Sequence, residues 1–169
     1  MAGFIQVSDV DVSEGPLLDF SEFYEVWRDP LRRALALAVG DIDEANEAID
    51  EAMTRALERW DRVRRYELPE GWVYRVGLNW LRGSYRKRRR EVIGHVDEKP
   101  GFELETPDLV VVAAVASLPW TFRQVVIARY YLDWSTADTA AALGIAEGTV
   151  KSRLARALRR IGQALEEEQ

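Results

Sequence analysis

The chain has 169 residues, 47% of them hydrophobic, with no cysteine, one histidine and a formal net charge of −6. The lack of cysteine excludes disulfides, thiolate metal sites and thiol nucleophiles, and His95 alone cannot build a zinc site. No apolar run is long enough to cross a membrane, and the first residues do not have the pattern of a secretory signal. We therefore expect a cytoplasmic protein that needs no metal or other cofactor.

The distribution of charge is more informative than its sum. Two short stretches, 82–90 and 151–160, hold eleven of the 23 basic residues and no acidic residue. Residues 1–51, in contrast, hold 13 acidic residues and three basic ones. Concentrated basic segments on an acidic body are typical of a protein that binds a polyanion. Charge runs also occur on solvated helix faces that bind nothing, so each segment needs support from its context.

The first predicted helix follows a polar leader, residues 1–18. Asp19 opens a capping-box pattern and places the helix start near Phe20. Pro30 is expected to kink or interrupt this helix, and Gly40 to end it.

The second predicted helix begins after Asp41. Its apolar residues recur at three- and four-residue steps and are expected to face the core: Ile42, Ala45, Ile49, Ala52, Met53, Ala56, Leu57 and Trp60. The opposite face is acidic and holds Asp43, Glu44, Glu47, Asp50 and Glu51.

A loop with at most a short turn is predicted over 61–71, followed by a helix from about Glu70 to Arg90. The last turns of that helix are the first basic stretch, and its inner stripe is Trp72, Val73, Val76, Trp80 and Leu81. Residues 92–108 contain glycine, proline and mostly acidic charges, which is typical of a linker between domains.

Beyond the linker, helices are predicted over 109–117, 122–132, 136–143 and about 147–164. Ser135 and Asp138 form a capping box before the third of these, and Gly144 ends it. No strand alternation of useful length occurs, so the sequence predicts an all-α fold of two small domains. The boundaries are a leader at 1–18, a domain at 19–91, a linker at 92–108 and a domain at 109–169.

The last two predicted helices have the layout of a helix-turn-helix. Ala140 is small enough for a close approach of the helices, Gly144 allows the positive φ of the turn, and Ile145 and Val150 fill the angle. The second helix then presents a polar outer face that can contact phosphates and base edges: Thr149, Lys151, Ser152, Ala155, Arg156 and Arg159. Its inner face is expected to hold Leu154, Leu158 and Ile161. The alternative is a helix that only packs against the rest of the protein.

These residues resemble a known family. The stretch 118–161, with LP…RQVV, RYY-x-D, A-x-x-LG and GTVKSRLARAL, is similar to region four of bacterial RNA polymerase sigma factors of the extracytoplasmic-function (ECF) group. The front half resembles region two of the same group in DFSEFYEVWRDPLRRALALAVGD, DIDEANEAIDEAMTRALERWDRV and PEGWVYRVGLNWLRGSYRKRRRE. The positions Tyr74-Arg75-Val76 and Asn79, together with the basic end of this segment, resemble a variant common in actinobacteria.

The resemblance implies a factor that binds core RNA polymerase and promoter DNA, and an anti-sigma protein restrains many members of the group. It implies that the acidic helix contacts the polymerase through Asp43, Glu44, Glu47, Asp50 and Glu51. It also implies that the minus-ten element is read by Arg62, Arg64, Arg65, Tyr66 and Asn79, with Arg82, Arg86, Lys87 and Arg88 on backbone phosphates. The outer face of the last helix would read the minus-thirty-five element.

Aromatic residues that could stack on an unpaired base are Trp72, Tyr74, Trp80 and Tyr85, although Trp72 and Trp80 are favoured as core residues. The sequence departs from the family pattern at three places. Asp50 stands where glutamine is usual, Ala146 stands where a capping serine is usual, and the segment 82–84 is RGS.

Three alternatives remain open at the level of sequence. The first is a plain helix-turn-helix regulator that binds operators by itself, and the second is a helical interaction protein or inactive adaptor. The third is an enzyme that uses the acidic pairs Asp43/Glu44 and Asp50/Glu51 for Mg²⁺. Adjacent positions on a helix diverge by about 100°, which disfavours such a site. No catalytic residue, membrane contact or small-molecule substrate is predicted.

Overall fold

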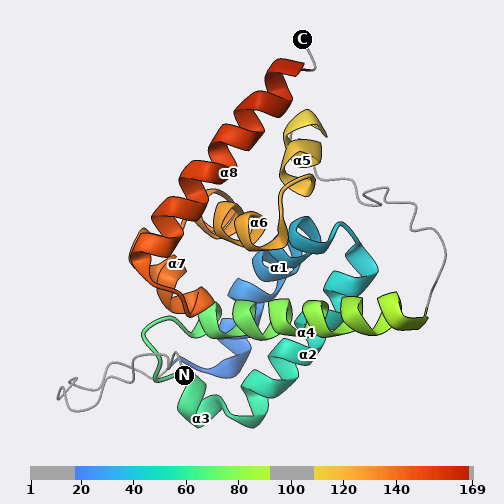
Figure 1. Cartoon of the computed structure of the whole chain (residues 1–169). Helices are drawn as coiled ribbons and strands as arrows, with labels where there is room; N and C mark the ends of the chain where they lie inside the picture. The colour runs from blue at the N-terminus through green and yellow to red at the C-terminus, as the bar shows by residue number, and fades with distance from the viewer. Residues whose placement is uncertain (1–17, 92–108, 168–169) are drawn as a thin grey trace.

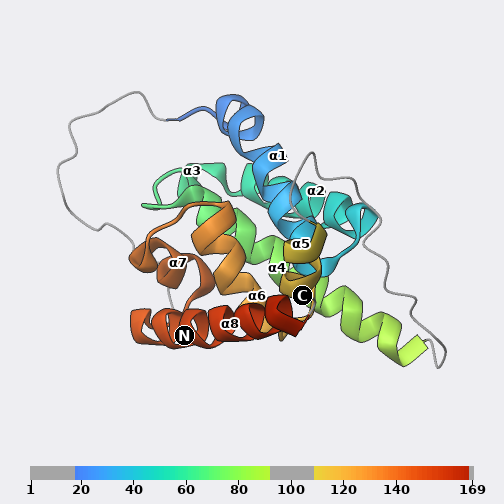
Figure 2. The same cartoon turned by 90° about the horizontal axis from the view of Figure 1, so that it is seen from above.

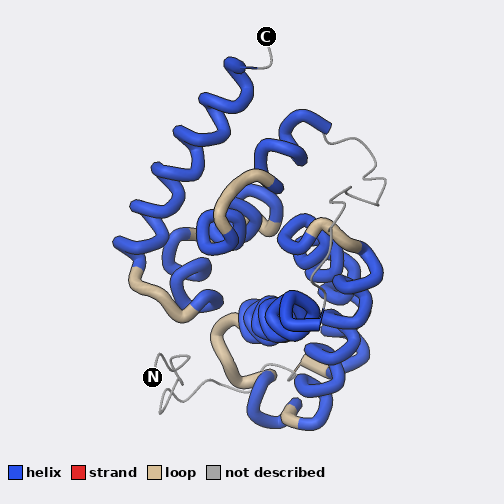
Figure 3. Tube along the Cα trace, turned by 45° about the vertical axis from the view of Figure 1, so that its right-hand side comes forward, coloured by secondary structure: helices blue, strands red, loops and turns tan. Residues whose placement is uncertain are grey.

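A computed structural model describes residues 18–91 and 109–167, and all regular structure in these ranges is helical (Figure 3). The elements are α1 (Phe20–Val39), α2 (Ile42–Glu58), α3 (Trp60–Val63), α4 (Pro69–Glu91), α5 (Leu109–Ala116), α6 (Trp120–Val126), η1 (Ile127–Tyr131), α7 (Thr136–Leu143) and α8 (Glu147–Glu167). The π-helical element η1 continues α6. Figure 1 shows α4 crossing the molecule between α2 and α3 on one side and α6 to α8 on the other. The predicted all-α fold is confirmed.

The predicted helix ends are set by local side chains. Asp41 precedes α2, and its carboxylate accepts a hydrogen bond from the Glu44 N–H at 2.9 Å. Gly40 ends α1 with φ of +79°, a conformation that costs glycine little, and its N–H donates to the Ala36 carbonyl at 2.7 Å. The Asp19 carboxylate caps α1 by accepting from the Ser21 N–H at 3.3 Å. These caps bound α1 and α2 where the sequence predicts.

Of the two expected outcomes, an interruption at Pro30 is wrong, because α1 runs through this residue from Phe20 to Val39. Phe23 before the proline and Leu31 after it are both fully buried. A proline inside a helix costs about 3 kcal/mol through its missing N–H and its ring clash. Packing of apolar side chains on both sides of Pro30 offsets this cost and holds the two halves in one helix.

The structure confirms the predicted apolar face of α2 except at one position, Leu57. Its buried residues are Ala45, Ala48, Ile49, Ala52, Met53 and Ala56. Leu57 was expected among them, but 56% of its surface is exposed, so that assignment is wrong. Leu57 follows Ala56 by about 100° around the helix, which places it at the edge of the buried stripe.

The helix-turn-helix is formed by α7 and α8. The Ser135 hydroxyl caps α7 by accepting from the Asp138 N–H at 2.9 Å, and Gly144 makes the turn with φ of +65°. On the inner face of α8, Val150 and Ala157 are fully buried, whereas Leu158 is 41% exposed. The expectation that Leu158 faces the core is therefore wrong, because the smaller Ala157 occupies the contact with α6 and lets the helices approach closely.

Candidate nucleic-acid interface

The outer face of α8 brings most of its predicted residues together on one surface. Lys151, Ser152, Ala155, Arg156 and Arg159 are exposed. Thr149 is half-buried, and its carbonyl accepts a hydrogen bond from the Ser152 hydroxyl at 3.1 Å. The buried inner face of the helix fixes the orientation of this surface, because a rotation of α8 would expose its apolar residues.

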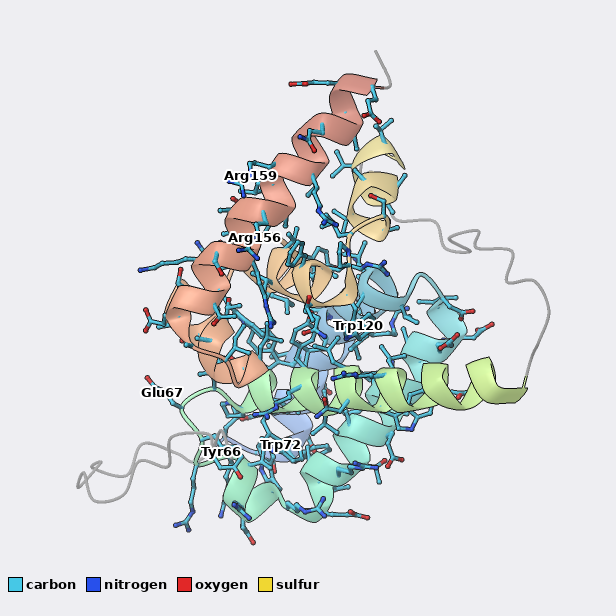
Figure 4. All side chains as sticks on the ribbon, in the orientation of Figure 1. Tyr66, Glu67, Trp72, Trp120, Arg156 and Arg159 are labelled. Carbon is cyan, nitrogen blue, oxygen red and sulfur yellow. The ribbon has the colours of Figure 1, made fainter. Side chains whose placement is uncertain are left out.

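An arginine-lined pocket continues this surface toward α6. The pocket encloses about 340 Å³ and is lined by Phe122, Arg156, Arg159, Arg160 and Gln163. The Arg160 guanidinium lies 5.3 Å from the centre of the Phe122 ring, a cation–π contact that fixes its position. Figure 4 shows Arg156 and Arg159 on α8. Among the described residues, no acidic side chain forms an ion pair with these three arginines, so they remain available for an anion.

Arg160 is a residue that the sequence prediction did not include in the site. The signal was present in the sequence, since Arg160 lies one helical turn after Arg156 and shares its face. The role of Phe122 could not be predicted, because it depends on how α6 packs against α8.

A second group of predicted residues surrounds the segment between α3 and α4. Arg62 and Arg65 are exposed. Arg64 is half-buried and forms an ion pair with Asp61, with 2.7 Å between the guanidinium nitrogen and the carboxylate oxygen. Tyr66 is half-buried, with its ring centre 6.5 Å from that of Trp72, and Figure 4 shows the two side by side. Arg62 belongs to α3 and not to a loop, so the irregular segment begins only at Arg64.

The remaining residues of this group lie along α4. Asn79 and Arg82 are exposed, and Figures 1 and 2 show the following basic turns of α4 projecting away from the packed helices. The side chains of the last predicted contacts lie outside the described residues: Arg86, Lys87 and Arg88.

Of the aromatic residues of α4, Trp72 and Trp80 are partly buried against the main core, in agreement with their predicted place. Tyr74 is fully buried, so the expectation that it is available for stacking on a base is wrong. Burial raises the pKa of its phenol well above the ordinary value. The side chain of Tyr85 lies outside the described residues.

The acidic face of α2 lies on the N-terminal part of the chain. Asp43, Glu47 and Asp50 are exposed, and Glu44 and Glu51 are half-buried. Asp50 pairs with Arg28 of α1 at 2.8 Å, which raises the pKa of that guanidinium, and Glu51 pairs with Arg55 at 2.7 Å. Within the described ranges, Asp43 and Glu47 form no ion pair and present their charges to solvent.

Two further findings concern the described residues alone. No group of three or more histidine, cysteine, aspartate or glutamate side chains there is arranged to hold a metal ion. No helix in the same part of the chain combines the length and the apolar content that a bilayer crossing requires.

Comparison with known proteins matches this arrangement to one family. Residues 109–161 match the model of sigma-70 region 4. The ECF RNA polymerase sigma factor SigL of Mycobacterium tuberculosis is 35% identical over 152 residues, covering 84% of this chain and 83% of the relative. The RNA polymerase sigma-E factor of Streptomyces avermitilis is 32% identical over 162 residues, covering 92% of this chain and 89% of the relative.

Two solved structures have the same fold. The sigma factor RpoE from Bartonella quintana, in complex with the anti-sigma factor NepR, superposes with a TM-score of 0.71 and 24% identity, covering 89% of this chain and 99% of that one. CnrH in complex with the cytosolic domain of CnrY gives a TM-score of 0.65 and 20% identity, covering 89% of each chain.

Proposed function

The chain belongs to the ECF group of RNA polymerase sigma factors, which bind core RNA polymerase for promoter-directed transcription initiation, and we propose which of its surfaces carry out each step. The observation that carries the proposal is the exposed, cationic outer face of α8, presented by a helix-turn-helix inside the matched region 4. No step of the proposal assigns a catalytic residue to the chain, and its place of action is the bacterial nucleoid in the cytoplasm.

In this proposal α8 lies in the major groove of the minus-thirty-five element. Ser152 and Ala155 are short enough for the helix axis to come close to the bases. Lys151 and Arg156 reach base edges or the adjacent phosphates from the exposed face, and the half-buried Thr149 lies at its edge. Arg159 and the arginine-lined pocket continue along the backbone and hold the register of the helix.

In the same proposal, the segment between α3 and α4 binds the minus-ten element. Removing a base from the duplex stack costs a few kcal/mol, and stacking on an aromatic side chain returns about 1–3 kcal/mol per base. Tyr66 supplies that surface, since it is the aromatic residue of this segment that is not buried in the core. Arg62, Arg64 and Arg65 surround it, Asn79 contacts a base, and the basic turns of α4 from Arg82 bind phosphates.

The polymerase docks on α2. The face formed by Asp43, Glu44, Glu47, Asp50 and Glu51 is continuous along the helix and fits a basic partner surface. Arg28 orients Asp50, the position at which this chain departs from the usual glutamine. We also propose an anti-sigma protein as a regulatory partner, because one of the two structural neighbours, the sigma factor RpoE, was solved in complex with the anti-sigma factor NepR.

Replacement of Asp43 and Glu47 by alanine tests the docking face. The variant is expected to bind purified core enzyme about tenfold more weakly, because it lacks two charges that contribute about 0.7 kcal/mol each, or about 1.4 kcal/mol together. A matched control replaces Glu166 and Glu167, two exposed acidic residues at the far end of α8. Equal core affinity of parent and variant would place the docking face elsewhere.

Run-off transcription distinguishes the sigma proposal from a plain helix-turn-helix regulator. A transcript that requires both core enzyme and this chain supports the proposal. Specific binding to an operator by the chain alone, with no effect on the core enzyme, supports the regulator. Binding to the core enzyme without promoter opening supports an inactive adaptor.

A further inference from the structure

The arginine-lined pocket of α8 gathers more positive charge than one DNA phosphate can neutralise. Arg156, Arg159 and Arg160 stand three and four positions apart, and with Gln163 they fall within an arc of about 100° around the helix. Like charges at this spacing repel each other and destabilise a helix. A DNA strand presents single charges that are separated along its backbone. A phosphate of the duplex that enters the pocket therefore leaves most of this charge without a counter-charge.

The sequence supplies no carboxylate to the pocket, although it does so for other arginines. Every arginine of α1 and α2 forms an ion pair with a carboxylate: Arg28, Arg32, Arg33 and Arg55. On α8, the position that could pair with Arg159 and Arg160 holds the neutral Gln163. The acidic residues Glu166 and Glu167 follow too far along the helix to pair with Arg160, and within the described ranges no ion pair reaches the pocket. The pocket therefore stays positive in a chain whose net charge is −6.

The floor of the pocket is fixed by the packing of α6 on α8. Phe122 is half-buried against a small apolar cluster that includes Leu118, Val126 and Ala157. The guanidinium group of Arg160 lies over the Phe122 ring, 5.3 Å from its centre, which covers one face of the guanidinium plane. Arg160 is exposed as a whole, and a planar guanidinium can also stack on a nucleobase. The pocket thus combines three cations with a flat surface that is held in place.

The charge and the size of the pocket fit a diphosphate group. Two adjacent phosphate groups at the end of a ligand carry about three negative charges near pH 7, which matches the three arginines. A guanidinium group can bind phosphate oxygens with two parallel N–H···O bonds, and the amide of Gln163 can donate a further one. The volume of about 340 Å³ lies in the range of about 300–1,000 Å³ that is typical of small-molecule sites.

We propose that the arginine-lined pocket is a binding site for a diphosphate group, carried by a nucleotide or by inorganic pyrophosphate, and that the bound ligand competes with the DNA backbone. The inference rests on the proposed function, because the same arginines continue the face of α8 that is assigned to the minus-thirty-five element. An occupied pocket has no guanidinium group left for backbone phosphates. The ligand therefore lowers DNA affinity while the start of the helix, with Lys151 and Ser152, stays exposed.

Isothermal titration calorimetry of the full chain with ADP, AMP and pyrophosphate tests the site. ADP is expected to bind at least about tenfold more tightly than AMP, because its second phosphate adds charge-assisted hydrogen bonds to the arginines. Tighter binding of ADP than of pyrophosphate would assign the site to a nucleotide, and equal binding would assign it to the inorganic diphosphate. Equal affinities for ADP and AMP, or no binding of either diphosphate, would overturn the proposal.

The variant Gln163→Glu places a carboxylate in the pocket without removing an arginine. It should bind ADP about tenfold more weakly than the parent, since the new charge pairs with Arg159 or Arg160 and repels the ligand. The control Thr54→Glu adds the same charge at an exposed position of α2 and should keep the affinity of the parent. The basic stretch 82–90 is the same in all three proteins, so binding there gives no difference between them. Equal ADP affinities of the parent and Gln163→Glu would place the ligand outside the pocket and overturn the proposal.

Fluorescence anisotropy of a labelled duplex tests the competition. ADP at about ten times its Kd should weaken DNA binding by the parent about fivefold or more, with AMP at the same ionic strength as the control. Equal DNA affinity in ADP and in AMP would overturn the competition. Run-off transcription tests the proposed function separately. A normal transcript from a chain that binds no diphosphate would overturn this inference alone, whereas absence of a transcript from a chain that binds ADP would overturn the proposed function.

Discussion

Replacing Arg156 or Arg160 with alanine tests whether the arginine-lined pocket of α8 binds the DNA backbone. Both guanidinium groups border the pocket, and neither is paired with an acidic side chain in the described part of the chain. Each variant removes one positive charge without creating a cavity in the core, since both residues are exposed. Arg160→Ala also loses the contact with Phe122, which contributes about 0.5–1 kcal/mol to stability.

The expected effect follows from counterion release. Each phosphate that a protein neutralises adds about 0.9 to the slope of log affinity against log salt. Loss of one contact therefore lowers the slope by about 0.9. A fourfold rise in salt then reduces the DNA affinity of the variant by a factor that is about 3.5 times smaller than the factor for the parent. Loss of both contacts lowers the slope by about 1.8 and gives a difference of about twelvefold.

Fluorescence anisotropy of a labelled duplex of about 20 base pairs measures this slope, and any sequence serves, because phosphate contacts do not depend on sequence. Arg160→Lys should keep the slope of the parent, since a lysine supplies the same point charge. Arg55→Ala is the control, because Arg55 is exposed on α2 and paired with Glu51. Slopes that are equal in the parent, Arg156→Ala and Arg160→Ala would show that neither guanidinium group contacts a phosphate.

Three further predictions concern stability. Ala146→Ser should cap α8 and add about 1 kcal/mol, which raises the melting temperature of the full chain by about 2–4 °C in calorimetry; no rise would refute the capping argument. Burial and the nearby Asp138 raise the pKa of Glu70 above its ordinary value. The protonated form of Glu70 therefore contributes to the free energy of unfolding at low pH, and this contribution is lost as the pH rises through the raised pKa. Glu70→Gln should therefore raise the free energy of unfolding near about pH 7 and leave it unchanged near about pH 3.5, and an effect equal at both pH values would show a different cause. Leu57→Ser should change the free energy of unfolding by no more than about 0.5 kcal/mol in urea titrations, because the side chain is 56% exposed, and a loss of about 2 kcal/mol would contradict that exposure.

The features of the fold that could be predicted from the sequence are those set by neighbours along the chain. Asp41 and Ser135 bond to backbone N–H groups three residues later, so a short pattern is sufficient to identify them. Gly40 and Gly144 end helices through a conformation that favours glycine. The spacing of apolar residues then defines each helix between its ends.

The predictions that the structure contradicts concern residues whose burial depends on segments distant along the chain. Leu57 and Leu158 lie at the edges of apolar stripes, and only the position of the neighbouring helix determines whether an edge is covered. Tyr74 is buried by groups 50 or more positions away in sequence, which no local pattern contains. The same reason explains why the burial of Trp134 and Ala142 against the core of α1, α2 and α4 was not predicted, nor the Arg28–Asp50 pair.

The candidate site also contains residues that local helix geometry predicts and residues whose place depends on tertiary packing. The outer face of α8 could be predicted, because helical geometry alone places Lys151, Ser152 and Arg156 on one side. The neighbourhood of Tyr66 could not, since its exposure depends on the packing of Trp72 against the main core.

The most direct test of the account is transcription of fragmented genomic DNA by purified core polymerase with and without this chain, followed by sequencing of the transcript 5′ ends. The account predicts new start sites that appear only with the chain and share two upstream sequence elements at one spacing. The same set of start sites with and without the chain would contradict it.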